Sequence, residues 1–198
     1  MKVIGLTGGV GCGKSTVAGI LMKEYNAKVL FTDDIAKASY AKDKEGYKKI
    51  VDFFGHDVLD IYGEIDRIRL GQIVFSDETK LKELNSLIHP IVWDEVIKSI
   101  KESKEANVSY LVIESAILIE AGYKALCDEI WYVRSDDSVR INRLEQTRGY
   151  SREKCQSIIS NQGKEEDYKK NCDVIIDNSA DIILLNKAID KIINSGKE

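Results

Sequence analysis

The chain has 198 residues, of which 43% are hydrophobic and 31% are charged, and its net charge is -4. This composition predicts one globular core with one or two inserted pieces, and the acidic balance gives nucleic acid no overall attraction. The four cysteines form no C-x-x-C pair, and we find neither a signal peptide nor an apolar run long enough to span a membrane. We therefore expect a cytoplasmic protein with no nucleic-acid or membrane partner.

The first sixteen residues carry the strongest signal in the sequence. Residues 3–6 are suited to a buried strand, and residues 8–15, GGVGCGKS, fit the pattern G-x-x-x-x-G-K-[ST]. In such a loop the backbone N–H groups point inward, and the helix that follows adds the positive end of its dipole. Lys14 can reach the outer phosphates of a triphosphate, and the Ser15 hydroxyl can ligate a bridging Mg²⁺. The residues predicted to bind the nucleotide here are Gly8, Gly9, Gly11, Cys12, Gly13, Lys14, Ser15 and Thr16.

The next elements follow from apolar spacing. Helical periodicity predicts a helix over residues 13–25, and residues 28–31 form the next strand. Either Thr32 or Asp33 can cap a further helix over residues 35–40.

Residues 43–104 have a different pattern, because four apolar helical faces follow one another without a strand. We expect a helical insertion. Its proline, Pro90, predicts a break between the last two helices, since proline fits the first turn of a helix but not its middle.

Strand patterns return at residues 110–113, 130–133 and 174–176, each nearly continuous in apolar character. Such runs are typical of strands that are covered on both faces. Residues 136–162 predict two charged helices with a turn between them, and residues 180–193 predict a terminal amphipathic helix. The sequence therefore predicts an α/β fold with five parallel strands and helices on both sides, as in nucleotide-binding proteins with a phosphate-binding loop.

Acidic residues after the second and third strands are candidates for chemistry. In an open parallel sheet, ligands bind beyond the carboxyl ends of the strands, so Asp33 could accept or orient the proton of an attacking hydroxyl. Its alternative role is a helix cap. Glu114 and Glu120 could contact substrate or Mg²⁺ through water, or they could be solvated carboxylates.

A basic group, Arg140, Arg143 and Arg148, lies on or after a charged helix. Arginines on a lid would neutralise charge on a transferring phosphoryl group. The alternative is a solvated helix on which Arg140 pairs with Asp136 or Asp137.

His89 has no metal-ligand spacing around it, so a structural or substrate-contacting role is favoured over metal binding. Cys12 precedes a helix N-terminus, a setting that lowers a thiol pKa, although it could also be a small filler.

Several motifs together closely resemble the dephospho-coenzyme A kinase family over nearly the whole chain. They are Gly5–Thr16, Asp33-x-x-Ala36-Lys37, Asp66-Arg67 with Leu70-Gly71-x-Ile73-Val74-Phe75, Leu84-Asn85-x-x-Ile88-His89-Pro90, Arg143-Leu144, Arg148, Gln162 and Asp173–Asn178. The resemblance implies phosphorylation of the ribose 3′-hydroxyl of dephospho-coenzyme A by ATP.

The same resemblance implies roles for parts of the chain. Residues 1–42, 105–135 and 165–198 match the nucleotide-binding core, residues 43–104 the coenzyme-binding insertion and residues 136–164 the lid. By the same analogy Asp33 matches the catalytic aspartate, and Asn178 falls where the family approaches the adenine of ATP. From the loop and the basic group we also expect Lys14, Arg140 and Arg143 to be catalytic and Arg148 to bind the nucleotide, and we expect His89 and Glu120 to contact the substrate. We expect a monomer or weak homo-oligomer.

The sequence departs from the family pattern at three places. Phe31 stands where the family has the first acid of a D-A-D run, so this chain lacks the first of the two carboxylates. The P-L-L-F-E run appears as Ala116–Glu120 and keeps its glutamate, and Gly149 replaces an aspartate after the lid arginine.

Two other classes of protein could also carry such a loop. A kinase for a sugar or nucleotide would share the loop and the lid, and only the inserted helices could tell it apart. A nucleotide-dependent switch should carry an N-K-x-D run, which is absent, and a D-x-x-G run after a buried strand. Asp60–Gly63 matches the second run by letter, but no apolar strand precedes it, so we interpret it as a turn.

Overall fold

The computed structural model describes residues 1–163 and 165–195. The chain forms two compact units: the first contains Met1–Leu30 and the described residues from Ser103 onward, and the second is Phe31–Glu102. Each unit is described below by itself.

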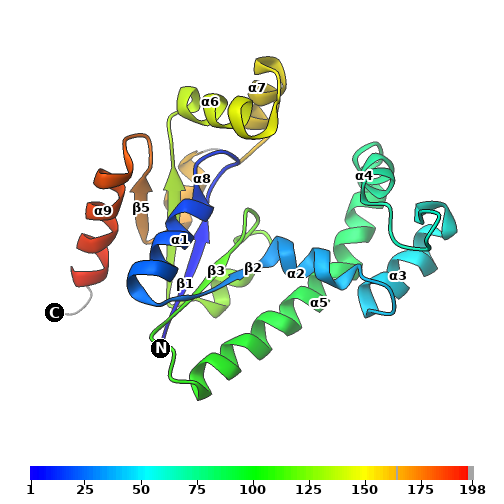
Figure 1. Cartoon of the computed structure of the whole chain (residues 1–198), viewed down its shortest axis with the longest axis horizontal. Coiled ribbons are helices and arrows are strands. Elements are labelled where there is room, and N and C mark those ends of the chain that lie inside the picture. The colour runs from blue at the N-terminus through cyan, green and yellow to red at the C-terminus, as the bar shows by residue number, and fades with distance from the viewer. Residues whose placement is uncertain (164, 196–198) are drawn as a thin grey trace. The chain divides into compact units, whose positions relative to one another are not determined.

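The first unit is built on a five-stranded sheet with the strand order β2-β3-β1-β4-β5 (Figure 1). Leu6 in the central strand pairs in register with Glu114 on one side and Trp131 on the other, and both pairings are parallel. The three middle strands are almost entirely buried, as expected for continuous apolar runs. All five predicted strands are confirmed: β1 Lys2–Thr7, β2 Lys28–Phe31, β3 Tyr110–Glu114, β4 Glu129–Arg134 and β5 Val174–Asp177.

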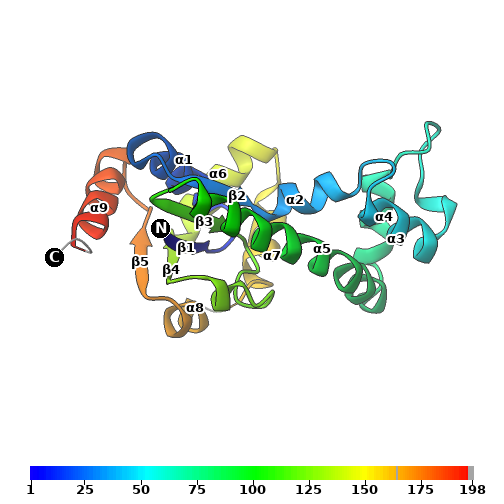
Figure 2. The ribbon, with the colours of Figure 1, turned by 90° about the horizontal axis from the view of Figure 1, so that it is seen from below.

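Helices cover both faces of this sheet, and Figure 2 shows α1 (Lys14–Tyr25) and α8 (Glu165–Asn171) on opposite faces. Helix α1 buries Val17, Ala18 and Leu21, and α9 (Ile182–Ser195) buries a similar stripe. Helix α8 was not expected from the sequence. It has seven residues, most of them charged, and only Tyr168 is buried, so no apolar period marks it.

The two charged helices predicted after β4 are present as α6 (Asp137–Arg148) and α7 (Arg152–Ser160). We use the word lid only as a label for residues 136–162. Gly149 ends α6 in the left-handed conformation, with φ of 63°, and the Ser151 side chain caps α7 by accepting from the Lys154 N–H. The two helices share a small core of Ile141, Leu144 and Cys155, against which Val10, Tyr150 and Ile159 pack. The lid therefore contacts the phosphate-binding loop through Val10.

The second unit is helical, with α2 (Thr32–Ser39), α3 (Glu45–Phe54), α4 (Arg67–Phe75) and most of α5 (Glu78–Glu105). Two short 3₁₀ turns complete the described elements: His56–Val58 in this unit and Tyr123–Leu126 in the first. Asp60–Gly63 forms the turn that the sequence predicted, because the Asp60 carboxylate accepts from the N–H groups of Tyr62 and Glu64.

The expected break at Pro90 is wrong, because α5 is one continuous helix of 28 residues with Pro90 inside it. Leu84, Ile88, Val92 and Val96 form a buried stripe at four-residue spacing that runs past the proline. Pro90 and the residue four before it, Ser86, are both exposed, so water can reach the carbonyl that loses its helical hydrogen bond. Burial of the stripe outweighs the cost of the proline.

The boundary expected for the helix after the second strand also differs from the observed one. Helix α2 begins at Thr32 rather than near residue 35, and Phe31 occupies its N-cap position without a side-chain cap. Asp33 therefore lies within the first turn, where a carboxylate is favoured by the helix dipole, and it is not the cap.

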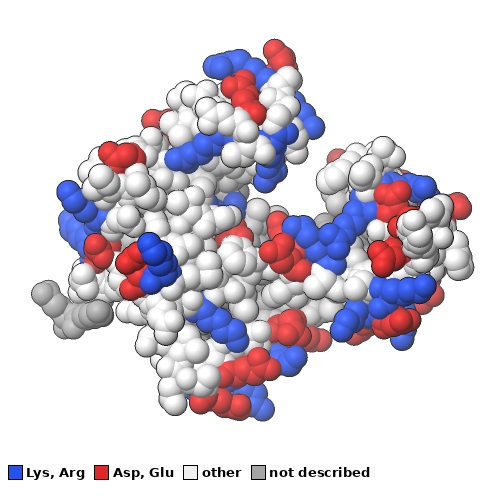
Figure 3. Space-filling view, viewed as in Figure 1, with Lys and Arg blue, Asp and Glu red and all other residues white. Residues whose placement is uncertain are grey.

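Figure 3 shows Lys and Arg side chains interspersed with Asp and Glu on the face that it draws, in keeping with the net charge of -4. None of the helices in the described residues is long and apolar enough to cross a membrane.

Candidate active site

The predicted phosphate-binding loop connects β1 to α1 in the first unit. Gly13 is the N-cap of α1 and adopts the left-handed conformation, with φ of 87°, and its carbonyl accepts from the N–H groups of Thr16 and Val17. A Cβ atom at Gly13 would overlap the side-chain amide of Asn178. The first turn of α1 thus begins at a left-handed backbone conformation that glycine adopts without strain. The free amide groups and the positive end of the helix dipole at this terminus can bind an anion.

The Lys14 side chain lies back across the start of this loop. Its Nζ atom donates to the carbonyl oxygens of Gly8 at 2.9 Å and Gly9 at 3.4 Å, and lies 3.7 Å from Glu114 Oε1. Only 12% of the Lys14 side chain and 11% of the Glu114 side chain are exposed. The carboxylate at the end of β3 therefore helps to hold the lysine ammonium beside the loop.

Arg140 of the lid reaches the tip of the loop. Its Nε atom donates to the Val10 carbonyl at 2.9 Å, Nη1 lies 3.1 Å from the Asp137 carboxylate, and Nη2 donates to Gln162 Oε1. The same Gln162 oxygen accepts from the Val10 N–H at 3.2 Å. Val10 is therefore bound through both of its main-chain polar groups. The predicted pairing of Arg140 with Asp137 is present, but it coexists with these loop contacts and does not replace them.

Arg143 bonds mainly to backbone. Its Nη1 atom donates to Ser135 Oγ at 3.1 Å and lies 3.4 Å from the carbonyls of Gly11 and Cys12, while Nη2 donates to the Asn178 carbonyl at 2.9 Å. Arginine suits this position because its planar group offers several donors in a fixed geometry. It joins the lid, the loop and the segment after β5.

The expectation of a low thiol pKa at Cys12 is wrong. The side chain is 1% exposed, and burial raises the pKa of the Cys12 thiol, although Lys14, Arg140 and Arg143 act to lower it. The thiol donates to the Gly9 carbonyl at 2.6 Å. Desolvation of a thiolate costs more than these cations return, so Cys12 is a protonated filler of the loop.

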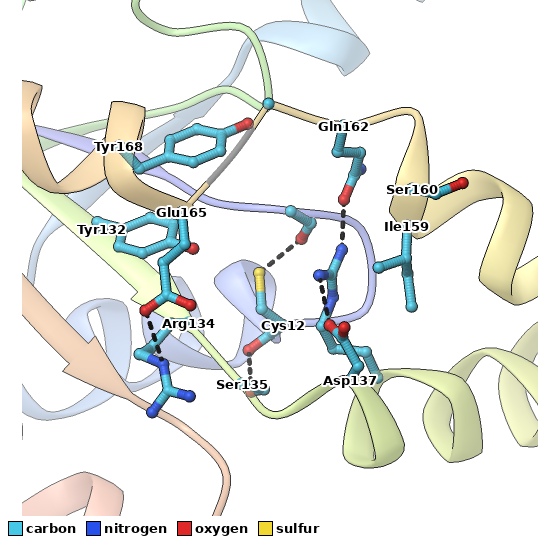
Figure 4. A pocket seen from close by; sticks show the side chains of 13 residues that line it. Cys12, Tyr132, Arg134, Ser135, Asp137, Ile159, Ser160, Gln162, Glu165 and Tyr168 are labelled. Carbon is cyan, nitrogen blue, oxygen red and sulfur yellow. Dashed lines mark hydrogen bonds and ion pairs between the residues drawn. The ribbon is translucent and has the colours of Figure 1, made fainter.

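A cavity of about 280 Å³ lies beside the loop in the first unit (Figure 4). Cys12 and Gly9 line it from the loop, Arg140 and Gln162 from the lid, and Tyr132 with Tyr168 from the side of the sheet; these two tyrosine rings stack with centroids 4.8 Å apart. Lys14 is not among the described residues that line it. The cavity therefore lies against the arginine contacts, and among the described contacts Lys14 reaches it only through its bond to the Gly9 carbonyl.

The remaining residues predicted in the first unit have few contacts. Ser15, Thr16 and Arg148 are exposed, and no hydrogen bond of their side chains is found among the described residues. The Ser15 hydroxyl is therefore free to ligate a metal ion. Glu120 is exposed and lines a smaller cavity with Tyr168 and Asn171, beside α8. Asn178, by contrast, is 4% exposed, and its Nδ2 atom donates to the Cys12 carbonyl at 2.9 Å.

Two predicted residues, Asp33 and His89, lie in the second unit. Asp33 is exposed in the first turn of α2, beside Asp34, which pairs with Lys37 at 3.0 Å. His89 is half-buried in α5, and burial lowers its pKa. Their roles toward a substrate stay predictions.

The structure adds Ser135 to the residues around the loop, and no local pattern in the sequence marks it. It also gives contacts to two positions that the family motifs include without a separate role: Gln162 accepts from the Val10 N–H and from Arg140. Gln162 stands 152 residues from Val10, so only the fold brings the two together.

Comparisons with known proteins agree with one another. The family model of dephospho-CoA kinase matches residues 2–183. A dephospho-CoA kinase of Carboxydothermus hydrogenoformans is 39% identical over 182 residues, which cover 92% of this chain and 88% of that protein. A crystal structure from Thermus thermophilus has a TM-score of 0.85 at 25% identity, with 98% and 97% of the two chains covered. A dephospho-CoA kinase from Campylobacter jejuni has a TM-score of 0.71 at 25% identity, with 99% and 98% covered.

Proposed function

The chain belongs to the dephospho-CoA kinase family, whose activity is the final step of coenzyme A synthesis, and from this premise we propose which residues carry the reaction. As a kinase, the protein takes its phosphoryl group from ATP. Its five-stranded parallel sheet and phosphate-binding loop are those of a P-loop kinase.

The observation that carries the proposal is the position of Lys14. Its ammonium group lies against the Gly8 and Gly9 carbonyls of the loop and the Glu114 carboxylate. A lysine held beside the loop would exchange some of these contacts for the outer phosphates of ATP, and positive charge at that place stabilises a phosphoryl-transfer transition state.

Mg²⁺ fits the donors that the loop offers. The exposed Ser15 hydroxyl would hold the ion, which would neutralise charge on the phosphate oxygens. None of the described residues form a cluster of three or more His, Cys, Asp or Glu side chains able to bind a metal.

Asp33 is proposed as the residue that receives or orients the proton of the ribose 3′-hydroxyl of dephospho-CoA. Two observations support it: the side chain is exposed, and the helix-cap role that competed with this one falls to Phe31. The acceptor is proposed to bind the helical unit, where His89 also lies, with Glu120 as a further contact.

Arg140 is proposed to act on the transferring phosphoryl group, and Arg143 to hold the loop, the lid and Asn178 together. The contacts of Arg143 are with backbone carbonyls and Ser135, which favours a positioning role over a direct one. Arg148 is exposed at the end of α6 and is proposed as a nucleotide contact.

A coupled assay of ADP release tests the choice of acceptor. The enzyme is given ATP and Mg²⁺ with dephospho-CoA, adenosine, AMP or shikimate in turn. Dephospho-CoA should exceed the others by orders of magnitude in kcat/KM. Comparable rates with shikimate or AMP would contradict the assignment and would favour a different small-molecule kinase.

A further inference from the structure

Helix α2 of the second unit carries two carboxylates, Asp33 and Asp34, but the only cation within its last turn is Lys37. Asp33 and Lys37 are four residues apart, so their side chains are neighbours on the helix surface, with roughly 5–6 Å between Cβ atoms. Lys37 is neutralised by Asp34 at 3.0 Å. A cation that could bind a substrate anion near Asp33 must therefore come from another element.

Arg67 is that cation. Its Nη2 atom donates to the Lys37 carbonyl at 3.1 Å, which brings the guanidinium of α4 to the end of α2 that carries Lys37. The backbone at Arg67 is fixed, because the Asp66 side chain caps α4 by accepting from the N–H groups of Ile68 and Arg69, both at 3.0 Å.

Tyr40 reports independently on the same neighbourhood. Burial raises the pKa of the Tyr40 phenol, the Arg67 guanidinium acts to lower it and the Asp33 carboxylate acts to raise it. Charges act on a phenol only at short range, so Asp33 and Arg67 both lie near Tyr40.

The charge of Arg67 is uncompensated. Among the described residues no carboxylate pairs with it, and its side chain is exposed. Arg69, two residues later, differs: it donates to the carbonyls of Asp57 and Leu59, each at 2.9 Å, and lies 3.6 Å from the Asp66 carboxylate. Arg69 therefore holds the fold together, whereas Arg67 is exposed and its one hydrogen bond among the described residues is to the Lys37 carbonyl.

We propose that Arg67 binds the diphosphate of the acceptor and so selects acceptors that carry one. This inference rests on the proposed role of Asp33. In dephospho-CoA the diphosphate is attached to the 5′ carbon of the ribose whose 3′-hydroxyl is phosphorylated, a few covalent bonds away. A ribose placed with its 3′-hydroxyl at Asp33 brings its diphosphate within reach of a cation on the same side of the unit, and arginine matches phosphate oxygens with paired donors.

A structural role is the competing explanation, since a cation that bonds a carbonyl at the end of a helix also stabilises that helix. The capping role and the binding role predict different effects of replacing Arg67. A capping role affects thermal stability and is indifferent to the acceptor, whereas a binding role depends on the diphosphate and on ionic strength.

The experiment compares Arg67→Ala, Arg67→Lys and, as a control that removes one exposed charge of the same unit, Lys82→Ala. For each, kcat and KM for dephospho-CoA are measured at low and high salt, together with kcat/KM for adenosine, which has no phosphate. Arg67→Ala should raise KM for dephospho-CoA at least ~10-fold with kcat changed less than about threefold, because a charge-assisted contact is lost. Its KM should no longer rise with salt. Arg67→Lys should recover part of the loss.

For adenosine, kcat/KM should stay within about twofold in every variant. The inference is overturned if Arg67→Ala leaves KM for dephospho-CoA unchanged, or if kcat/KM falls equally for both acceptors. Failure of the Asp33 proposal looks different, because there Asp33→Asn would retain its kcat.

Discussion

The side-chain amide of Asn178 donates to the main-chain carbonyl of Cys12 at 2.9 Å, across 166 residues of sequence. Ser135 Oγ donates to the Asn178 carbonyl at 2.8 Å, so the segments after β4 and β5 both support the loop. This contact explains why the loop keeps a glycine next to Cys12: a Cβ atom at Gly13 would occupy the position of the Asn178 amide.

A pair of glycines in and after the loop tests this relationship. Gly13→Ala places a Cβ against Asn178 at a left-handed φ, so ATP binding should be lost or weakened at least ~10-fold, and unfolding should become easier by about 1 kcal/mol or more. Gly19→Ala, within α1, meets nothing within 4 Å and should be neutral or stabilising by ~0.5–1 kcal/mol. Calorimetric titration and thermal melts measure both; equal behaviour of the two variants would contradict the argument.

The ammonium of Lys14 should be indispensable. Lys14→Ala removes the cation beside the loop, and turnover should fall by several powers of ten while circular dichroism shows a retained fold. Lys23→Ala, at the exposed end of the same helix, is the control and should keep parental turnover. Near-normal turnover of Lys14→Ala would rule out the proposed phosphate contact.

Asp33 has a matched control in its neighbour. Asp33→Asn should lower kcat by at least ~10²-fold, because an amide cannot accept a proton, while the melting temperature stays within a few degrees of the parent. Asp34→Asn, in the same turn but paired with Lys37, should retain kcat within a small factor. In the parent, kcat/KM should show an acid limb that Asp33→Asn lacks. Parental kcat in Asp33→Asn would return the proton-accepting role to another carboxylate, with Glu114 and Glu120 the candidates.

The two lid arginines should separate kinetically. Arg140→Ala should lower kcat more than it raises KM, since contacts to a phosphoryl group strengthen as charge develops. Arg143→Ala removes hydrogen bonds to the loop and to Asn178, so it should also lower the melting temperature. Arg152→Ala, exposed in α7, controls for charge. An Arg140→Ala effect confined to KM would mean uniform substrate binding instead.

Cys12 should react slowly with thiol reagents. Burial raises its pKa, so near neutral pH the thiol is protonated, and labelling should be at least ~10-fold slower in the native protein than in urea. As pH rises through the ordinary thiol pKa of about 8.5, the unfolded chain ionises and the folded one does not. Burying the protonated Cys12 thiol therefore does not reduce the free energy of unfolding below that pH, and it lowers this free energy progressively as the pH rises above it. Mass spectrometry of the Cys12 peptide measures the labelling; rapid native labelling would contradict the buried assignment.

Local sequence patterns were sufficient to predict the strands of the sheet and the phosphate-binding loop. A strand covered on both faces must be apolar at every position, so residues 110–113 and 130–133 could be recognised without knowing their neighbours. The phosphate-binding loop is likewise encoded in consecutive residues, because its chemistry depends on successive amides and the first turn of one helix. The family motifs extended this knowledge to the reaction.

Tertiary structure decided what depends on distant partners. Whether Cys12 is ionised depends on how deeply the fold buries it, and its position before a helix N-terminus gave the opposite expectation. Pro90 lies inside a helix because a buried stripe continues past it, which local proline rules do not contain. The contacts of Arg140 with Val10 and Gln162 join residues 130 and 22 positions apart. Composition and spacing specify which residues are available, whereas burial and long-range hydrogen bonds determine the state in which each is held.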